Sequence, residues 1–219
     1  RLSRHRPPIS VAVLISGSGS NLQALIEAVA AGQLAASIDV VVSNKADAYG
    51  LQRAAAAGIE TLVVDHRHYA TREDYDSALA DALHRYSPDL VVLAGFMRIL
   101  GSRFVAAFAG RILNIHPSLL PLYPGLDTHQ RALDAGDRVH GCTVHYVTAT
   151  LDAGPAIIQG QVDVLEGDTA EQLASRVLAV EHKIYAAAIS LIAEGRLRFN
   201  EDQAWLDDKL LQKPLPFSP

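Results

Sequence analysis

The stretch from Ile9 to Asn21, ISVAVLISGSGSN, decides the fold class. Its first part, Ile9–Ile15, is a continuous apolar and largely β-branched run, which is typical of a strand buried on both faces of a parallel sheet. The glycine-serine segment 16–21 breaks that run. Apolar residues then recur at helical spacing over residues 22–29, and Gly32 stands where a helix C-terminus favours glycine. The stretch therefore predicts a strand, a glycine-rich turn and a helix.

The same alternation of strand and helix continues along the chain. Further strands are expected over residues 38–43, 61–64, 90–94 and 111–115, and further helices over residues 46–57, 71–86 and 102–108. Strands that alternate with helices at this spacing form βαβ units, whose right-handed crossovers place helices on both faces of a parallel sheet.

The pattern changes after Pro117. We expect a short helix, two strand-like runs and a long helix, over residues 128–135, 142–148, 156–164 and 170–194. Thr169 and Gln172 form a plausible capping box at the start of the long helix. The predicted fold class is α/β: a Rossmann-like twisted, mostly parallel sheet with helices on both faces and an antiparallel C-terminal portion. A flexible arm is expected at residues 1–8, a single domain at 9–200, and a tail packed on it at 201–219.

The composition excludes several classes of protein. The chain has 219 residues, of which 49% are hydrophobic, and a formal net charge of -5. This balance excludes a disordered chain and the broad basic surface of a nonspecific nucleic-acid binder. No apolar run approaches the roughly 20 residues that span a bilayer, so we expect no membrane contact. Cys142 is the only cysteine, which favours a reducing cytoplasm.

The glycine-rich segment Gly17–Asn21 is the first candidate site. Glycines let the backbone approach a ligand closely, and the helix N-terminus that follows offers free N–H groups to a phosphate. The spacing is neither the dinucleotide fingerprint nor the nucleotide-triphosphate loop, and no lysine follows. A single phosphate remains open. The alternative is an ordinary turn in which Ser20 or Asn21 caps the helix.

Asn114 and His116 form the second candidate site, and Asp152 is a third candidate whose function would require it to lie near His116. Asn114 and His116 alternate at the end of a strand, so they share a face with their Cα atoms about 7 Å apart. An amide donor beside an imidazole can stabilise an oxyanion. A carboxylate from Asp152 would favour the protonated imidazole and could accept a proton. The alternatives are a polar strand end for His116 and an ordinary turn for Asp152, which precedes Ala-Gly-Pro.

The remaining candidate residues give weaker indications of function. The apolar segment 95–100, which follows a strand, suits a flat heterocycle, although core packing explains it equally well. His140, Cys142 and His145 look like metal ligands, but on a strand the first two face one side and His145 the other. We therefore predict no metal site. Ser118 lacks the strand–turn–helix setting of a hydrolase nucleophile.

The motifs resemble those of a known family. The segments that carry the resemblance are ISGSGSNLQAL, VLAGFMRIL, RILNIHPSLLP, YPGLDTH and LDAGP. Together they resemble the phosphoribosylglycinamide formyltransferases, within the folate-dependent formyltransferase superfamily, from about Ile9 to about Trp205. The resemblance implies transfer of the formyl group of 10-formyltetrahydrofolate, as co-substrate, to the amine of N1-(5-phospho-D-ribosyl)glycinamide in purine biosynthesis. These two small molecules are the expected partners, with no nucleic acid or membrane, and a monomer or a homodimer is expected.

The resemblance also implies roles for single residues. Asn114, His116 and Asp152 match the catalytic trio. The matching substrate-binding residues are Gly19, Ser20, Asn21 and, near the ribose, Glu181. The matching folate-binding residues are Arg72, Met97, Arg98, Ile99, Leu100, Asn114, Thr148, Leu151 and Asp152.

Two alternatives to the transferase remain at this point. The first is a formyltetrahydrofolate deformylase, which uses a similar trio with water as the nucleophile and resembles the same core. Those enzymes carry an additional N-terminal regulatory domain, which we expect to be absent because few residues precede Ile9 here. The second is a non-catalytic folate- or nucleotide-binding protein, which the intact trio disfavours.

Overall fold

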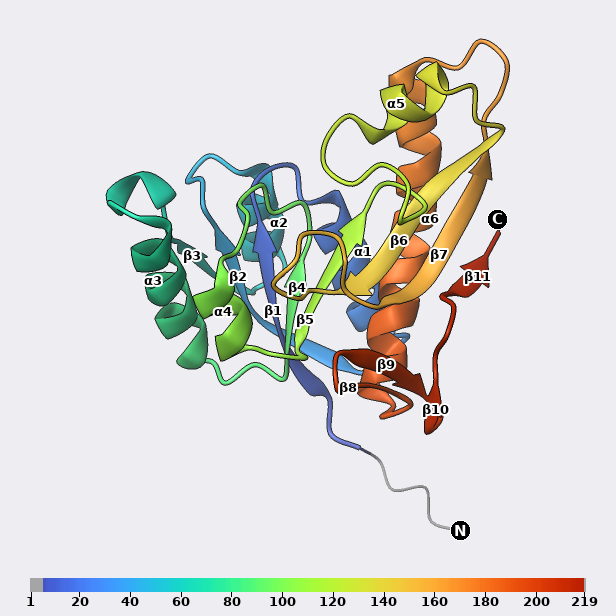
Figure 1. Ribbon diagram of the computed structural model, residues 1–219. Coiled ribbons are helices and arrows are strands. Elements are labelled where there is room, and N and C mark those ends of the chain that lie inside the picture. The colour runs from blue at the N-terminus through green and yellow to red at the C-terminus, as the bar shows by residue number, and fades with distance from the viewer. Residues whose placement is uncertain (1–5, 219) are drawn as a thin grey trace.

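A computed structural model describes residues 6–218 of the chain, so residues 1–5 of the predicted arm lie outside the described residues. The elements follow one another as strands and helices along the chain (Figure 1). Their bounds are β1 Ile9–Ile15, α1 Ser20–Ala30, β2 Ala36–Ser43, α2 Tyr49–Ala56, β3 Glu60–Val63, a 3-10 turn His66–His68, α3 Arg72–His84, β4 Leu90–Leu93, α4 Ser102–Ala107, β5 Ile112–His116, α5 Thr128–Asp134, β6 Val139–Tyr146, β7 Ala156–Asp163, α6 Ala170–Ala193, β8 Leu197–Asn200, β9 Gln203–Leu206, β10 Lys209–Leu210 and β11 Leu215–Phe217.

One mixed sheet forms the centre of the protein. Its strand order is β11-β7-β6-β5-β4-β1-β2-β3. Strands β3, β2, β1, β4 and β5 run parallel, β6 runs antiparallel to β5 and β7, and β11 runs parallel to β7. The order of the parallel half is that of a Rossmann-like fold, in which ligands bind beyond the carboxyl ends of the strands. The predicted fold class is confirmed.

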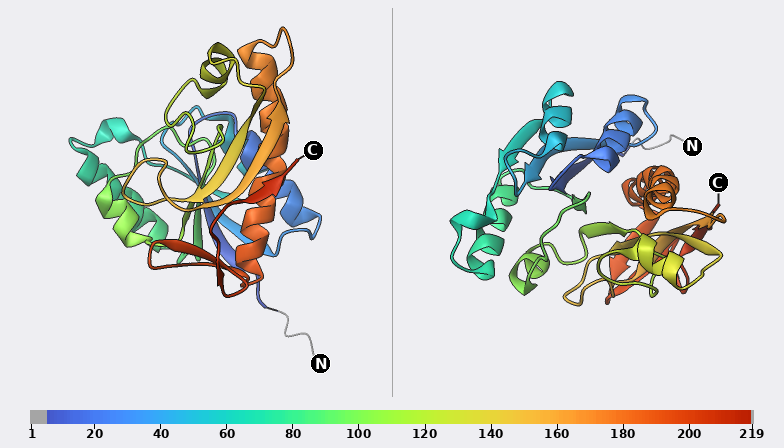
Figure 2. Two further views of the ribbon diagram at one scale, coloured as in Figure 1. Left: turned by 45° about the vertical axis from the view of Figure 1, so that its right-hand side comes forward. Right: turned by 90° about the horizontal axis from the view of Figure 1, so that it is seen from above.

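Strand β1 is buried on both faces, as its continuous apolar sequence predicts. Val11, Val13 and Ile15 face the core cluster that includes α1 and α6. Ala12 and Leu14 face the other cluster, which includes α3 and α4. The two groups of helices cover opposite sides of the sheet, as the view from above shows (Figure 2). The carboxyl end of the parallel strands therefore remains the open edge at which a site can form.

The long helix α6 lies against β6 and β7 and also contacts α1. The predicted capping box is confirmed, because Thr169 Oγ1 accepts the N–H of Gln172 while the Gln172 side chain accepts the N–H of Thr169. A small antiparallel sheet, β10-β9-β8, follows the helix. The chain then returns to the main sheet, where β11 pairs with β7.

The observed starts of α2 and β6 lie three residues away from the predicted ones, the largest such differences among the predicted elements of the main sheet and its helices. Helix α2 starts at Tyr49 rather than at residue 46, because the side chain of Asn44 is buried against Ser16 and the following residues form a turn closed by the Ala48 N–H and the Lys45 carbonyl. Strand β6 starts at Val139 rather than at residue 142, because its first residues pair with the end of β7. Within residues 6–218, no helix is long and apolar enough to cross a bilayer.

Candidate active site

A cavity of about 400 Å³ opens at the carboxyl ends of β4 and β5. The segment between β4 and α4 forms one wall, and the loop between β6 and β7 forms the opposite wall. Most of the lining is apolar, with a few polar groups that converge, as is typical of a site for a flat organic ligand. The lining residues are Leu93, Phe96, Met97, Arg98, Ile99, Leu100, Asn114, His116, Gly125, Leu126, His145, Val147, Thr148, Ala149, Thr150, Leu151 and Asp152.

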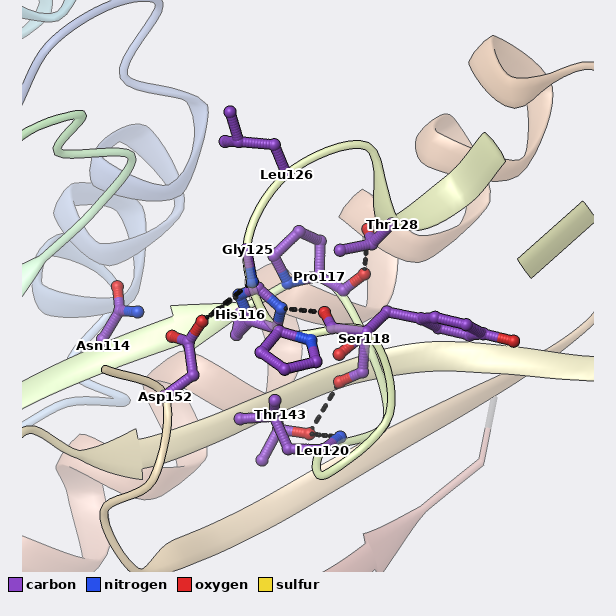
Figure 3. A network of polar contacts seen from close by, with 12 residues as sticks. Asn114, His116, Pro117, Ser118, Leu120, Gly125, Leu126, Thr128, Thr143 and Asp152 are labelled. Carbon is purple, nitrogen blue, oxygen red and sulfur yellow. Dashed lines mark hydrogen bonds and ion pairs between the residues drawn. The ribbon is translucent and has the colours of Figure 1, made fainter. Parts of the chain in front are cut away.

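The structure brings Asn114, His116 and Asp152 to this one cavity. Asn114 and His116 alternate on β5 and share a face, as the strand period requires. Asp152 reaches them from the loop between β6 and β7, with its Oδ2 atom 3.7 Å from Nδ1 of His116. Figure 3 shows the carboxylate directed toward the imidazole and toward the backbone of Gly125. Residues distant in the sequence therefore form one polar group.

Asp152 is held by the backbone around it. Its φ angle of 53° lies in the left-handed region, which aspartate tolerates better than most residues. Its Oδ2 atom accepts the N–H of Gly125 at 3.1 Å, and its side chain is only 5% exposed. The carboxylate thus faces His116 with one backbone donor and little water around it.

The orientation of His116 follows from its hydrogen bond to the loop. Nε2 lies 2.7 Å from the carbonyl oxygen of Tyr123. Because a carbonyl only accepts, Nε2 carries a proton and donates it (Figure 3). Nδ1 is then the nitrogen that faces Asp152 and the cavity. Nδ1 therefore lies where it can meet both the carboxylate and a ligand in the cavity.

His145 on β6 also lines the cavity, although its sequence context suggested only a metal ligand. Its Nδ1 atom donates to the carbonyl of Tyr146 at 3.0 Å, and burial lowers the pKa of the ring, which favours the neutral form. Nε2 is then free to accept from the Asn114 amide at 3.3 Å. Asn114 therefore presents its amide group, held by a neighbour, to the cavity. The contact between Asn114 and His145 follows from the antiparallel pairing of their strands, which the sequence alone does not reveal.

The other residues considered as metal ligands lie apart from His145. His140 contacts His129, with 3.1 Å between their ring nitrogens, and burial lowers the pKa of both rings. Cys142 is buried, which raises the pKa of its thiol. Among residues 6–218, no group of three or more His, Cys, Asp and Glu side chains is arranged to hold a metal ion.

The glycine-rich turn precedes α1 as predicted, but neither Ser20 nor Asn21 caps the helix. Gly19 is the N-cap residue, with a φ angle of 73°. A Cβ atom on Gly19 would lie 2.6 Å from Cα of Gly50, so α2 packs directly against the turn. Asn21 instead turns its amide toward Glu181 on α6, at 3.3 Å. The first N–H groups of α1 have no partner within the helix and can bind an anion.

Glu181 is a buried acid at the junction of α1 and α6. Its exposed fraction is 8%, and burial raises its pKa to about 7, against the smaller opposing effect of the hydrogen bond from Asn21. Asn21 Oδ1 is also buried and has no hydrogen-bond partner within the described residues. The junction therefore carries polar groups that its own contacts do not satisfy.

We expect Glu181→Gln to remove a pH dependence of stability. In the folded chain the carboxyl has a pKa of about 7, compared with an ordinary value of 4.5. Between these values the folded state binds more protons than the unfolded state, so the free energy of unfolding falls as pH rises, by up to about 3 kcal/mol. Urea unfolding should show Glu181→Gln more stable than the parent at pH 8 and equal to it at pH 4. The same difference at both pH values would contradict this explanation.

Of the other residues predicted to bind the folate, all but one line the cavity. Met97, Arg98, Ile99, Leu100, Thr148 and Leu151 all line the cavity. Arg72 does not: it begins α3 with an exposed side chain and lies next to Gly101, beyond the end of the cavity wall. The sequence could not show this, because the position of α3 relative to the wall depends on packing.

Comparison with known proteins identifies the family. The sequence model of the family described as "Formyl transferase" matches residues 9–189. The chain belongs to the formyl transferase family. It is 51% identical over 203 residues to phosphoribosylglycinamide formyltransferase of Escherichia coli (strain K12), covering 93% of this chain and 96% of that protein.

Two further members of the family agree with this placement. The human trifunctional purine biosynthetic protein adenosine-3 is 50% identical over 192 residues, which cover 88% of this chain and 19% of that protein. The solved structure of phosphoribosylglycinamide formyltransferase from Coxiella burnetii superposes with a TM-score of 0.92 at 51% identity, covering 96% of this chain and 99% of that chain. The resemblance in the motifs is therefore confirmed over nearly the whole chain.

Proposed function

We propose that this member of the formyl transferase family transfers the formyl group of 10-formyltetrahydrofolate to the amine of N1-(5-phospho-D-ribosyl)glycinamide, giving the N-formyl product and tetrahydrofolate in the synthesis of purines. The observation that carries the proposal is the meeting of an amide, an imidazole and a carboxylate at one cavity. The identity of 51% to the Escherichia coli enzyme supports the choice of substrates.

The two substrates are assigned to two parts of the site. The apolar wall at residues 95–100 suits the flat heterocycle of the folate, with Thr148, Leu151 and Asp152 on the opposite side. The turn before α1 suits the phosphate of the ribonucleotide, through the N–H groups of Gly19, Ser20 and Asn21. Glu181, bonded to Asn21, is assigned to the ribose hydroxyls. The glycinamide amine would then reach the trio between these parts.

The trio provides the groups that a direct transfer needs. The amine nitrogen forms a bond to the formyl carbon, and the carbonyl electron pair moves to oxygen. The amide of Asn114 and the Nδ1 proton of His116 stabilise that oxyanion, and a single donor of this kind typically contributes about 3 kcal/mol. Asp152 accepts the amine proton, directly or through a water. The bond from carbon to N10 then breaks as N10 receives a proton from His116 or that water.

The protein contributes mainly by positioning. Holding two substrates in reacting geometry can supply about 7–11 kcal/mol of the barrier. The amine itself is the nucleophile, so the proposal includes no covalent intermediate on the enzyme. The proposed residues need only bind, orient and move protons.

An assay with the purified chain tests the proposed function. Formation of tetrahydrofolate from 10-formyltetrahydrofolate is followed with and without the ribonucleotide amine. Formation that requires the amine supports the transferase. Equal formation without it indicates a deformylase, and no reaction with binding retained indicates a non-catalytic folate-binding protein.

Gly19→Ala should weaken the binding of the ribonucleotide more than that of the folate. The left-handed conformation costs alanine about 1–2 kcal/mol, and the new Cβ would meet Gly50, so we expect KM for the ribonucleotide to rise about tenfold or more. Gly58→Ala is the matched control, because it has the same positive φ angle with open space around it. Equal losses of affinity for both substrates would argue against the phosphate role.

The setting of the enzyme belongs to the same proposal. We assign it to the cytoplasm, where its single cysteine would remain reduced, and to a monomer or a homodimer. Residues 9–200 are proposed as one domain, with residues 201–219 packed on it. Small molecules, rather than nucleic acid or membrane, are its proposed partners.

A further inference from the structure

We propose that Asp76 is a positioning residue for the folate, because it fixes the far end of the cavity wall at residues 95–101 without touching the ligand. This inference rests on the proposed function, since it concerns the substrate assigned to that wall. It assigns Asp76 and Gly101 a role in folate affinity.

The wall is an irregular segment between β4 and α4. It supplies Phe96, Met97, Arg98, Ile99 and Leu100 to the cavity, and the side chains of Met97 and Ile99 are more than half exposed. No helix or strand forms within it, so sheet and helix hydrogen bonds do not hold its backbone. Its conformation must depend on contacts made by other parts of the chain.

One such contact holds the first half of the wall. Ser16, at the end of β1, accepts the N–H of Met97 on its Oγ atom at 2.8 Å. The same hydroxyl donates to Oδ1 of the buried Asn44 at 2.5 Å. This contact fixes Met97 but leaves the segment from Arg98 onward to be held elsewhere.

Asp76 holds the other end. It lies on α3, is 1% exposed, and accepts the N–H of Gly101 on Oδ2 at 2.9 Å. Gly101 is the N-cap residue of α4 and provides no side-chain cap of its own. The carboxylate therefore fixes both the end of the wall and the start of the helix that follows it.

The carboxylate of Asp76 leaves no room for a side chain at position 101. A Cβ atom on Gly101 would overlap Oδ2 of Asp76, although the φ angle of −81° is ordinary for any residue. Glycine is thus needed at this position for the approach of the carboxylate, and the backbone conformation itself does not require it.

Burying the Asp76 carboxylate also lowers the stability of the fold. Burial raises the pKa of its carboxyl, against the effects of the Gly101 N–H and of Arg72 and Arg98. Its Oδ1 atom is buried and has no hydrogen-bond partner within residues 6–218. A buried hydrogen-bond acceptor without a partner typically lowers stability by about 1–3 kcal/mol. The presence of such an acceptor in a folded protein therefore needs an explanation. The role of Asp76 in holding the cavity wall provides this explanation.

The test separates folate affinity from all other effects. For Asp76→Ala and Gly101→Ala we expect KM for 10-formyltetrahydrofolate to rise about tenfold, since the first removes the acceptor of the residue 101 N–H and the second displaces that acceptor with a methyl group. The KM for the ribonucleotide and kcat should stay within about twofold, as expected when binding alone is affected. Asp76→Asn should retain the parent KM, because its amide oxygen can still accept the Gly101 N–H.

Thr71→Ala is the matched control for stability. Thr71 caps the same helix by accepting the N–H of Asp74, and it lies outside the cavity lining. It should lower the unfolding temperature without changing KM for the folate. If Asp76→Ala lowers stability but leaves the two KM values unchanged, or raises both equally, the inference is wrong. It is also wrong if Asp76→Asn behaves like Asp76→Ala.

A second variant and a binding measurement keep the test decisive. If Asp76→Ala does not fold, Gly101→Ala decides, because it leaves Asp76 in place and adds a single methyl group against its carboxylate. Calorimetric binding of tetrahydrofolate to the parent chain and to Gly101→Ala needs no turnover. Weaker binding by the variant supports the inference even if the parent does not formylate the ribonucleotide, and that second result would reject only the proposed function.

Discussion

His116→Ala is expected to lower kcat by about 10²–10³-fold, because it removes a proposed hydrogen-bond donor to the developing oxyanion. The ring is oriented before the substrates arrive, since Nε2 donates to the Tyr123 carbonyl and leaves Nδ1 toward the cavity. Alanine keeps the strand but supplies no proton. The KM values for both substrates should change by only a few-fold, and steady-state kinetics with each substrate varied in turn measures all three quantities.

The control for His116→Ala is His68→Ala. His68 is exposed in the 3-10 turn and lies outside the cavity lining, so it tests the loss of an imidazole as such. It should retain the parent kcat. Near-parent turnover in folded His116→Ala would remove the imidazole from the mechanism.

Asp152→Asn is expected to lower kcat by about 10²–10⁴-fold, the range typical for loss of a general base. The substitution preserves shape, and the amide oxygen can still accept the N–H of Gly125. It removes the negative charge that faces Nδ1 of His116 at 3.7 Å and, with it, the proposed acceptor of the amine proton. The loss should therefore appear in kcat, with the affinity for both substrates largely retained.

Asp168→Asn is a close match for this variant. Its carboxylate is also 5% exposed and also accepts a backbone N–H, that of Leu165, but it pairs with Arg176 outside the cavity. It should lower stability and leave turnover unchanged. A similar loss of turnover in both variants would point to a general effect of losing a buried carboxylate, and would count against a specific role for Asp152.

Much of the fold could be predicted because its signals are local. The buried strand Ile9–Ile15, the glycine turn and the capping box of α6 each depend on neighbouring residues, and the structure has all three. Strand order depends on distant pairing, so the position of β6 between β5 and β7 could not be derived. The start of α2 was wrong for a similar reason, since Asn44 bonds to Ser16 far away in the sequence.

In the candidate site, too, features that depend on neighbouring residues could be predicted, and features that depend on distant contacts could not. The alternation of Asn114 and His116 was visible in the sequence, and Asp152 was a separate candidate whose proximity to His116 only the fold shows. The contacts of His145 with Asn114 and of Asp76 with Gly101 could not be predicted, because each joins elements that only the folded chain brings together. Arg72 shows the converse, because a matching motif did not place its side chain in the cavity lining.

The central claim is that the trio directs the formyl group to an amine. The most direct measurement uses 10-formyltetrahydrofolate with an isotopic label in the formyl carbon, mixed with the ribonucleotide amine and the purified chain. We predict that the label released from the folate appears in the N-formyl ribonucleotide in equal amount to the tetrahydrofolate formed, and that it stays in the folate when the amine is omitted. Label appearing as formate at the same rate with and without the amine would contradict the claim.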